Sequence, residues 1–322
     1  MRSPFPSLLA VLVATPLQAQ LSIMDMHLHA FPANFAGPQR TGQCVSYDYL
    51  PVWDQQEAYA DAWGRRLTQP PCDDPVWAPE TAEEIMEQTL AAMDSLNIVG
   101  VVSGSPSHVR AWIEAAPERL YPGLRFELGV EGAHFSPEQL RDLHSRNQLA
   151  VLGEITNQYS GVEPDDERME AYWALAEQLD IPVAIHVGTG PPGVIYLGSR
   201  QYRGRLHSAL TLEEVLARHP DLRVQIMHAG YPMLDDLLTL LYAHPQVYVD
   251  VGVIVWLLPR AEFYRYLRGI VIAGYLNRVM FGSDQMIWPG VIERSIAILQ
   301  EAPFLNATQK REITSPSVVY ES

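Results

Sequence analysis

Six histidine and carboxylate side chains stand out because each lies at or just beyond the end of an apolar, β-branched run. The first two are two positions apart, and side chains with that spacing on a strand project to the same side, so both imidazoles could reach one ion. Imidazole nitrogen and carboxylate oxygen are ligands that suit Zn²⁺ and similar first-row ions. The sequence therefore predicts a metal site made of His27, His29, Glu154, His186, His228 and Asp284.

Each of these residues also has a structural explanation when it is considered alone. An isolated His-x-His pair is a weak motif, and a lone histidine such as His186 is more often a hydrogen-bonded core residue. Glu154 could pair with an arginine, and Asp284 could cap a helix. Six such residues at strand ends are an improbable coincidence, so we interpret them jointly as a functional site.

The remaining histidines serve as a comparison. Five are expected in helices or in loops that close helices on the opposite face, and we predict structural roles for His108, His144, His207, His219 and His244. His134 follows the third predicted strand and is close to the expected site, but no role is predicted for it.

Short β-branched runs alternate with amphipathic stretches, which is the pattern of βα units around a parallel sheet. Strands are predicted over residues 21–27, 98–103, 119–123, 151–155, 183–186, 223–228, 247–251 and 279–283. Helices are predicted over residues 81–96, 137–147, 168–179, 212–218, 231–243 and 260–273. Eight strands with intervening helices, and no obvious second unit, favour a single α/β domain that forms a closed (β/α)₈ (TIM) barrel.

Residues 31–79 form a long segment, rich in Pro, Gln, Trp and Tyr, between the first strand and the first helix. Connections of this length are usually lids, binding loops or small insertions, and a loop after a barrel strand lies over the active face. The only two cysteines, Cys44 and Cys72, lie in this segment. A disulfide between them would close a loop of about 28 residues and stabilise it by a few kcal/mol. Two unpaired thiols are the alternative that the sequence leaves open.

The first residues have the pattern of a secretory signal peptide, in which Arg2 precedes an apolar run and Ala19 precedes the expected cleavage point. The run is roughly ten residues long, whereas a membrane anchor needs about 20. We therefore expect residues 1–19 to be removed and residues 20–322 to form an exported domain, periplasmic or secreted. The formal charge of −16 argues against a nucleic-acid partner. A small-molecule substrate is the expected partner. The sequence leaves open whether the protein forms a homo-oligomer.

Four segments carry a family resemblance, namely residues 25–29 (DMHLH), 181–188 (IPVAIHVG), 227–230 (MHAG) and 281–284 (FGSD). Together they resemble the amidohydrolase superfamily, specifically the amidohydrolase-related branch that includes aminocarboxymuconate-semialdehyde decarboxylase. The resemblance runs from about Ile23 to Ile313. It implies that a divalent metal, usually zinc, is held by His27, His29, His186 and Asp284. It also implies that His228 binds a second ion or acts on the substrate.

Glu154 bears on the number of metal ions. In relatives with two metals, the fourth strand often supplies a bridging group, which is a carbamylated lysine or a glutamate. No lysine precedes Lys310 in this chain, so a lysine bridge is excluded. If two ions bind, the carboxylate of Glu154 is the available bridge and His228 becomes a ligand of the second ion. We favour two ions over one.

The leading functional hypothesis is hydrolysis of an amide, lactone or ester. A metal would lower the pKa of bound water and polarise a substrate carbonyl. Asp284 would accept the water proton and pass it to the leaving group. His228, or the metal, would stabilise the oxyanion. Aromatic residues in the loops give a mild preference for small cyclic or aromatic substrates.

A non-oxidative decarboxylase is the alternative. In that reaction the metal would orient a carboxylated substrate, which Arg200 and Arg203 could bind, although a surface role for both arginines is the simpler interpretation. A binding protein built on a barrel without activity is a third class. It would be expected to have lost metal ligands, and none is missing here.

Overall fold

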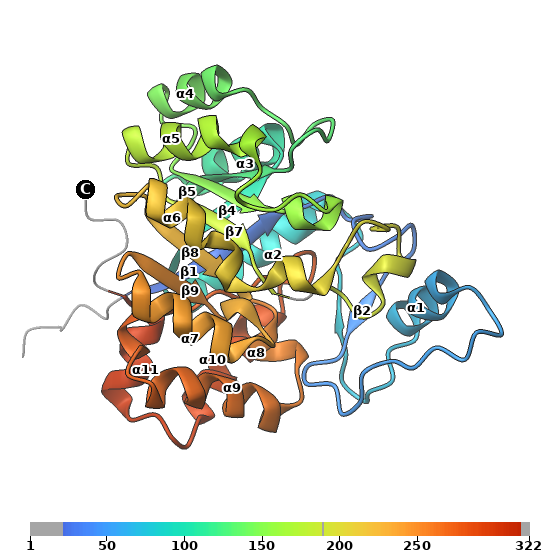
Figure 1. Ribbon diagram of the computed structural model, residues 1–322. Coiled ribbons are helices and arrows are strands. Elements are labelled where there is room, and N and C mark those ends of the chain that lie inside the picture. Colours follow the sequence, from blue (N-terminus) through green and yellow to red (C-terminus); the bar gives the residue numbers. More distant parts are fainter. Residues whose placement is uncertain (1–21, 189, 317–322) are drawn as a thin grey trace, which may run out of the picture.

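The computed structural model describes residues 22–188 and 190–316, so the predicted signal peptide, residues 1–19, lies outside the described part. Eight parallel strands follow one another in chain order around one sheet (Figure 1). They are β1 (Ile23–Ala30), β4 (Ile98–Gly104), β5 (Leu120–Phe126), β6 (Val151–Ile155), β7 (Val183–His186), β8 (Val224–Met227), β9 (Val247–Asp250) and β10 (Val279–Met280). The amide of Met26 donates to the carbonyl of Phe281 at 2.9 Å, which brings the first and last strands together. The predicted α/β barrel is confirmed.

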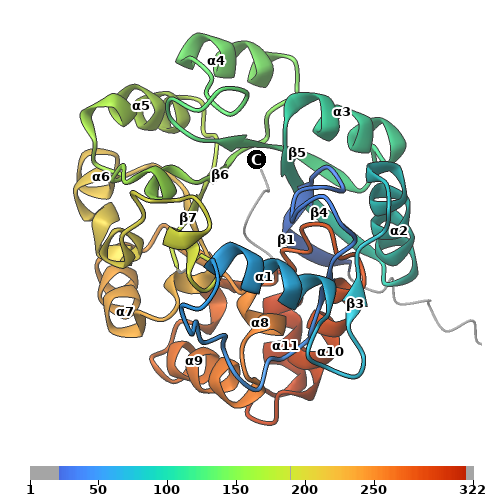
Figure 2. The same cartoon turned by 90° about the vertical axis from the view of Figure 1, so that its right-hand side faces the viewer.

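Helices surround the strands as an outer ring (Figure 2). They are α2 (Ala82–Ser95), α3 (Pro106–Ala115), α4 (Pro137–Ser145), α5 (Glu170–Gln178), α6 (Glu213–Arg218), α7 (Leu234–Ala243), α9 (Arg260–Ile272), α10 (Val291–Glu301) and α11 (Ala307–Thr314), with the short α8 (Ile254–Leu257) after β9. Three of them begin at capping boxes, in which Thr81 pairs with Glu84, Ser136 with Gln139 and Asn306 with Gln309. The caps fix where α2, α4 and α11 start.

Three strands end three residues away from the position predicted from the sequence. Strand β1 continues to Ala30, so both histidines of the His-x-His pair lie within the strand rather than at its end. Strand β5 continues to Phe126, three residues beyond the predicted end at position 123. Strand β10 stops at Met280, and residues 281–284 continue as irregular backbone. Asp284 therefore lies in a loop. Its backbone amide donates a hydrogen bond to the carbonyl of His27 at 2.8 Å.

Buried apolar side chains form two clusters, one between the strands and the helices and one inside the ring of strands. The outer cluster joins strands to helices and includes the fully buried Trp173 and Trp256. The inner cluster comes from the strands alone and contains Met26, Val101, Val151, Ala184, Met227 and Met280. Because His186 is two positions beyond Ala184 on β7, its side chain lies on the same inner face. The inner cluster thus forms the floor on which the predicted site rests.

The insertion at residues 31–79 is an ordered cover rather than a structureless loop. It contains the two-stranded sheet of β2 (Gly42–Gln43) and β3 (Val76–Trp77), and the helix α1 (Tyr59–Thr68), which lies across the mouth of the barrel in Figure 2. The predicted disulfide between Cys44 and Cys72 is present. None of the helices in the described part of the chain is long and apolar enough to cross a membrane.

Candidate metal centre

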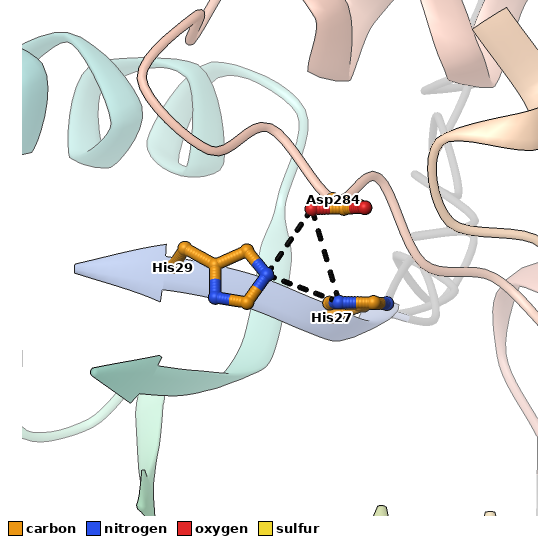
Figure 3. A group of neighbouring side chains, drawn as sticks. All are labelled: His27, His29 and Asp284. Atoms are coloured by element: carbon orange, nitrogen blue, oxygen red, sulfur yellow. Dashed lines mark hydrogen bonds and ion pairs between the residues drawn. The ribbon is translucent and has the colours of Figure 1, made fainter. Parts of the chain in front are cut away.

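Three of the predicted ligands meet at the mouth of the barrel, where β1 lies beside the loop that follows β10 (Figure 3). Nε2 of His27 and Nε2 of His29 are 3.1 Å apart. Oδ1 of Asp284 lies 3.1 Å from Nε2 of His29 and 3.8 Å from Nε2 of His27. The donor atoms of all three residues lie within 4.8 Å of one another, so they could bind one ion together.

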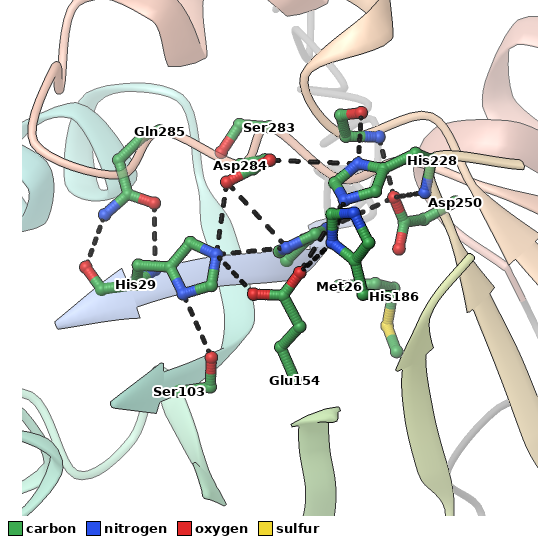
Figure 4. Close-up of polar contacts among 12 residues, drawn as sticks. Met26, His29, Ser103, Glu154, His186, His228, Asp250, Ser283, Asp284 and Gln285 are labelled. Atoms are coloured by element: carbon green, nitrogen blue, oxygen red, sulfur yellow. Dashed lines mark hydrogen bonds and ion pairs between the residues drawn. The ribbon is translucent and has the colours of Figure 1, made fainter. Parts of the chain in front are cut away.

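A second group of donors lies beside the first, with the carboxylate of Glu154 between them (Figure 4). Nδ1 of His186 and Nε2 of His228 are 3.0 Å apart. Oε1 of Glu154 lies 2.6 Å from Nδ1 of His186 and 3.6 Å from Nε2 of His228. Oε2 of the same carboxylate lies 3.7 Å from Nε2 of His29, which belongs to the first group. Glu154 therefore faces both groups, one oxygen to each.

Hydrogen bonds of Nδ1 in two of the imidazoles indicate that the other ring nitrogen, Nε2, directs a lone pair at the centre. Nδ1 of His228 lies 2.9 Å from the carbonyl oxygen of Gly252. Because a carbonyl can only accept, Nδ1 carries the hydrogen and the neutral ring has its lone pair on Nε2. Nδ1 of His27 lies 3.3 Å from Oδ1 of Asp250, with the same consequence for its Nε2. Such partners are typical of histidines that bind metal.

The arrangement of these donors fits one or two divalent cations. Imidazole nitrogens about 3 Å apart must either share a hydrogen or hold a cation between them, because two facing lone pairs would repel each other. Oδ1 of Asp284 is buried and, apart from its close contacts with His27 and His29, has no donor in the described part of the chain. Buried acceptors that lack a donor are unusual unless an ion or water satisfies them. The side chains present thus fit a metal site.

Two further residues position β1 and the Asp284 loop, and neither was predicted from the sequence. Oδ1 of Asp25 accepts hydrogen bonds from the amides of His27 at 3.0 Å and Ser283 at 2.9 Å. Gln285 accepts from the amide of His29 at 2.9 Å and donates to its carbonyl at 2.7 Å. Burial raises the pKa of Asp25 to about 7, although its hydrogen bonds to Ser283 and His27 act to lower it.

A family model described as amidohydrolase matches residues 24–315, which is most of the chain. The chain belongs to the amidohydrolase family. No curated protein matches the sequence. Membership in this family, together with the His, Asp and Glu groups described above, indicates a metal-dependent enzyme.

Solved structures share the fold of this amidohydrolase at low sequence identity. A 5-carboxyvanillate decarboxylase from Sphingomonas paucimobilis is 13% identical, with a TM-score of 0.53 over 92% of this chain and 97% of that one. A putative 2-pyrone-4,6-dicarboxylic acid hydrolase from Pseudomonas putida is 16% identical, with a TM-score of 0.52 over 92% and 96%. A dihydroxybenzoic acid decarboxylase from a Polaromonas species, with bound manganese, is 12% identical, with a TM-score of 0.52 over 92% and 95%. These likenesses concern the fold alone.

A cavity of about 910 Å³ opens above the centre and includes five of the six predicted ligands in its lining, all except His27. Much of the remaining lining is apolar. The insertion contributes Phe31, Leu50 and Trp63, and the segment after β9 contributes Trp256. Arg200 also lines the cavity, whereas Arg203 does not and donates to the carbonyls of Arg200 and Tyr202. The cavity is large enough for a drug-sized molecule.

Arg125 and Glu127, at the end of β5, form a charged pair in the cavity wall that the sequence analysis missed. Nη2 of Arg125 lies 3.3 Å from Oε2 of Glu127. Glu127 is buried and also accepts from Ser160 at 2.5 Å and Thr156 at 3.1 Å. The carboxylate is thus held by three donors, while Arg125 has further N–H groups to offer. The prediction failed because it ended this strand at position 123.

Burial and neighbouring charges shift the pKa values of residues at the centre in opposite directions. Burial disfavours a charged His27, but the carboxylates of Asp284 and Asp250 outweigh it and raise the pKa of His27 to about 10. Burial alone would raise the pKa of Glu154, yet hydrogen bonds with His186 and His228 hold it well below its usual range. Protons and metal ions compete for the same donors, so the charges that raise the pKa of His27 also favour a bound cation.

His207 is the one histidine whose predicted position on the opposite face is wrong. Its ring is fully buried beside the centre, 5.6 Å from the ring of His186 and stacked at 4.4 Å on Tyr202. Burial, with the neighbouring His186, lowers the pKa of His207 to about 3, so the ring is neutral. His219, by contrast, lies between Glu170 and Glu177 and has the predicted structural role. The loop that carries His207 folds back in a way that its sequence does not reveal.

Proposed function

We propose that this amidohydrolase is a two-metal hydrolase that cleaves an amide, lactone or ester bond in a small cyclic or aromatic substrate. The observation that carries the proposal is the position of Glu154, whose two oxygens face two separate groups of donors. A carboxylate placed in this way is suited to join two ions, and paired ions are typical of sites that activate water and clamp the attacked group. Zn²⁺ is the ion we propose, since the donors are imidazoles and carboxylates. Manganese is the alternative.

A bound ion of this kind lowers the pKa of a water molecule and polarises a carbonyl group. Asp284 is the residue placed to manage the proton, because it is buried at the base of the cavity and, apart from its contacts with the two imidazoles, its Oδ1 has no donor among the described residues. It would accept the proton from water and return it to the leaving group. Imidazoles on both sides of the carboxylate keep the pKa of Asp284 low despite burial, so it is ionised and ready to act as the base.

His228 was assigned either a ligand role or an oxyanion-stabilising role from the sequence, and its hydrogen bond to Gly252 favours the ligand role. With Nδ1 donating to that carbonyl, a neutral His228 presents a lone pair and no hydrogen to the centre. A donor to the oxyanion must then come from another residue.

The cavity supports a substrate that combines an apolar body with an anionic group. Aromatic side chains from the insertion would cover the apolar part. Arg125 is held by Glu127 and has unused donors, so it would bind a carboxylate through charge-assisted hydrogen bonds. The same feature would serve a decarboxylase, which is the second candidate and the named activity of several proteins with this fold.

Export remains part of the proposal. The disulfide between Cys44 and Cys72 supports it, because disulfides persist mainly in oxidising compartments.

The test of the proposed reaction is a side-by-side assay of the chain beginning at Gln20, loaded with Zn²⁺ or Mn²⁺. One panel holds aryl esters, lactones and N-acyl amino acids, and the other holds hydroxybenzoic acids monitored for carbon dioxide release. We expect hydrolysis that is lost on chelation, whereas carbon dioxide release without hydrolysis would overturn the proposal in favour of the decarboxylase.

A further inference from the structure

Tyr159 lies in the cavity wall immediately beside the centre. It belongs to the short 3₁₀ turn Asn157–Ser160 that follows β6, the strand that carries Glu154. Its phenolic oxygen is 3.2 Å from Nε2 of His186, and the two rings are 4.8 Å apart. Tyr159 is also only partly buried, because one side of it lines the cavity. The residue thus touches both a predicted ligand and the space where a substrate would lie.

The phenolic hydrogen of Tyr159 has no acceptor among the described residues when His186 binds a metal ion through Nδ1. His186 faces Glu154 and His228 with Nδ1, so when Nδ1 acts as a ligand, Nε2 carries the ring hydrogen and donates it to the oxygen of Tyr159. A phenol has one hydrogen of its own to donate. No residue in the described ranges, 22–188 and 190–316, makes another hydrogen bond with this oxygen. The hydrogen is therefore free to point into the cavity.

The surrounding residues hold the phenol in this position. A Cβ atom added to Gly190 would lie 2.7 Å from the oxygen of Tyr159, so glycine permits the close approach. The amide of Gly190 in turn donates to the hydroxyl of Tyr202 at 3.2 Å. Buried His207 packs against both rings, 5.9 Å from Tyr159 and 4.4 Å from Tyr202. A donor fixed in advance is what stabilisation of a developing charge requires.

We propose that Tyr159 is a further catalytic residue, which accepts the Nε2 hydrogen of His186 and donates its own hydrogen to the substrate oxygen that becomes negative during attack. The proton stays on Tyr159 throughout, so the step is a hydrogen bond rather than a proton transfer. The assignment rests on the proposed hydrolytic function and supplies the oxyanion donor that His228 does not provide. It also explains why the phenol stands beside a ligand and in the cavity at once.

The test compares Tyr159→Phe with Tyr242→Phe, which removes a hydroxyl from an exposed ring on α7. Both variants keep their rings, so the packing around His207 is retained. For the best hydrolysed member of the ester and lactone panel, we expect Tyr159→Phe to lower kcat by about 100-fold with little change in KM, as loss of one oxyanion donor does elsewhere. Tyr242→Phe should stay within a few-fold of the wild type.

Two readouts separate catalysis from mere orientation of His186. If Tyr159 only orients the imidazole, the loss of activity in Tyr159→Phe will disappear once metal is added to saturation, because loss of such a partner acts on metal affinity. We expect the lower kcat to persist when both variants are fully loaded with metal instead. The second readout is calorimetric binding of phenylphosphonate, a tetrahedral anion, to the metal-loaded proteins, which we expect to be at least about tenfold weaker in Tyr159→Phe.

The outcomes distinguish this assignment from the proposed function. An unchanged kcat, or a loss of activity fully explained by lost metal, would overturn the role of Tyr159 while leaving hydrolysis intact. If the wild type hydrolyses nothing in the panel, the proposed function fails, and phenylphosphonate binding still decides the donor role. Equal affinity in wild type and Tyr159→Phe, or no binding to the wild type, refutes it, and weaker binding in the variant alone supports it.

Discussion

Nδ1 of His27 lies 3.3 Å from Oδ1 of Asp250, a buried carboxylate at the end of β9. The amide of Gly252 and Nε2 of Gln225 each donate to that carboxylate at 2.7 Å, so its position is fixed. The contact holds the ring of His27 with Nε2 directed at the centre. Asp250 therefore orients a predicted metal ligand without belonging to the predicted ligand set.

Asp250→Asn should weaken metal binding, because a neutral amide is a poorer acceptor for the Nδ1 hydrogen of His27. Loss of such a partner typically costs 10–100-fold in metal affinity, and we expect a change on that order. The measurement is competition for Zn²⁺ with a chromophoric chelator. Asp235→Asn, at an exposed position on α7, is the matched control. Equal metal affinity in the two variants would show that the contact is incidental.

Asp25→Asn should change how stability depends on pH. Burial raises the pKa of the folded carboxyl to about 7 from an ordinary value of 3.8, so between these values the folded state holds a proton that the unfolded state has lost. The contribution of Asp25 to stability is thus present below pH 4 and is lost as pH rises toward 7. An amide carries no such penalty. In thermal unfolding after chelation, the variant should gain stability over the wild type between pH 5 and pH 8, and a parallel pH dependence would contradict the raised pKa.

Cys44→Ser combined with Cys72→Ser should lower stability, since the disulfide closes a loop with a sequence separation of 28 residues. Cross-links of that span contribute roughly 3 kcal/mol, mainly by restricting the unfolded chain. Denaturant unfolding of the oxidised wild type and the double variant measures the difference. Addition of a reductant to the wild type should reproduce the effect and leave the variant unchanged. Coincident unfolding curves would mean that the bridge does not constrain the insertion.

Arg125→Gln should alter selectivity more than chemistry. Removal of the guanidinium is expected to raise KM for carboxylated substrates by about tenfold or more, because charge-assisted hydrogen bonds are lost, and to have little effect on uncharged ones. The comparison is a ratio of kcat/KM values for an acid and its methyl ester. Arg110→Gln, on the exposed face of α3, is the control. The same ratio in both variants would remove the anion-binding role from Arg125.

Much of the fold could be predicted from apolar runs in the sequence, because a parallel strand that is buried on both faces is a nearly continuous apolar segment. The segment 151–155 was predicted with its observed bounds as β6. The third strand was predicted to end at Gly123, whereas β5 continues through Leu124 and Arg125 to Phe126. That error removed Arg125 and Glu127 from the candidate residues.

The rest of the site depends on tertiary contacts that no local pattern encodes. Asp250 follows an apolar run, one residue before the end of the strand predicted over 247–251, and could have been included with the chosen residues. Tyr159 and His207 could not, because the turn after β6 and the loop after β7 meet only once the barrel has closed. The insertion has no regular apolar period, so its helix and two-stranded sheet were not predicted.

The central claim is that Glu154 joins two ions, and metal content measures it directly. Purified, dialysed wild type is analysed by inductively coupled plasma mass spectrometry beside Glu154→Gln, with Glu83→Gln, an exposed position on α2, as the control. We predict about two equivalents of metal in the wild type and the control, and about one in Glu154→Gln, because the neutral amide is a poor bridge between cations. An active wild type that holds no metal, or equal metal content in all three proteins, would contradict the account.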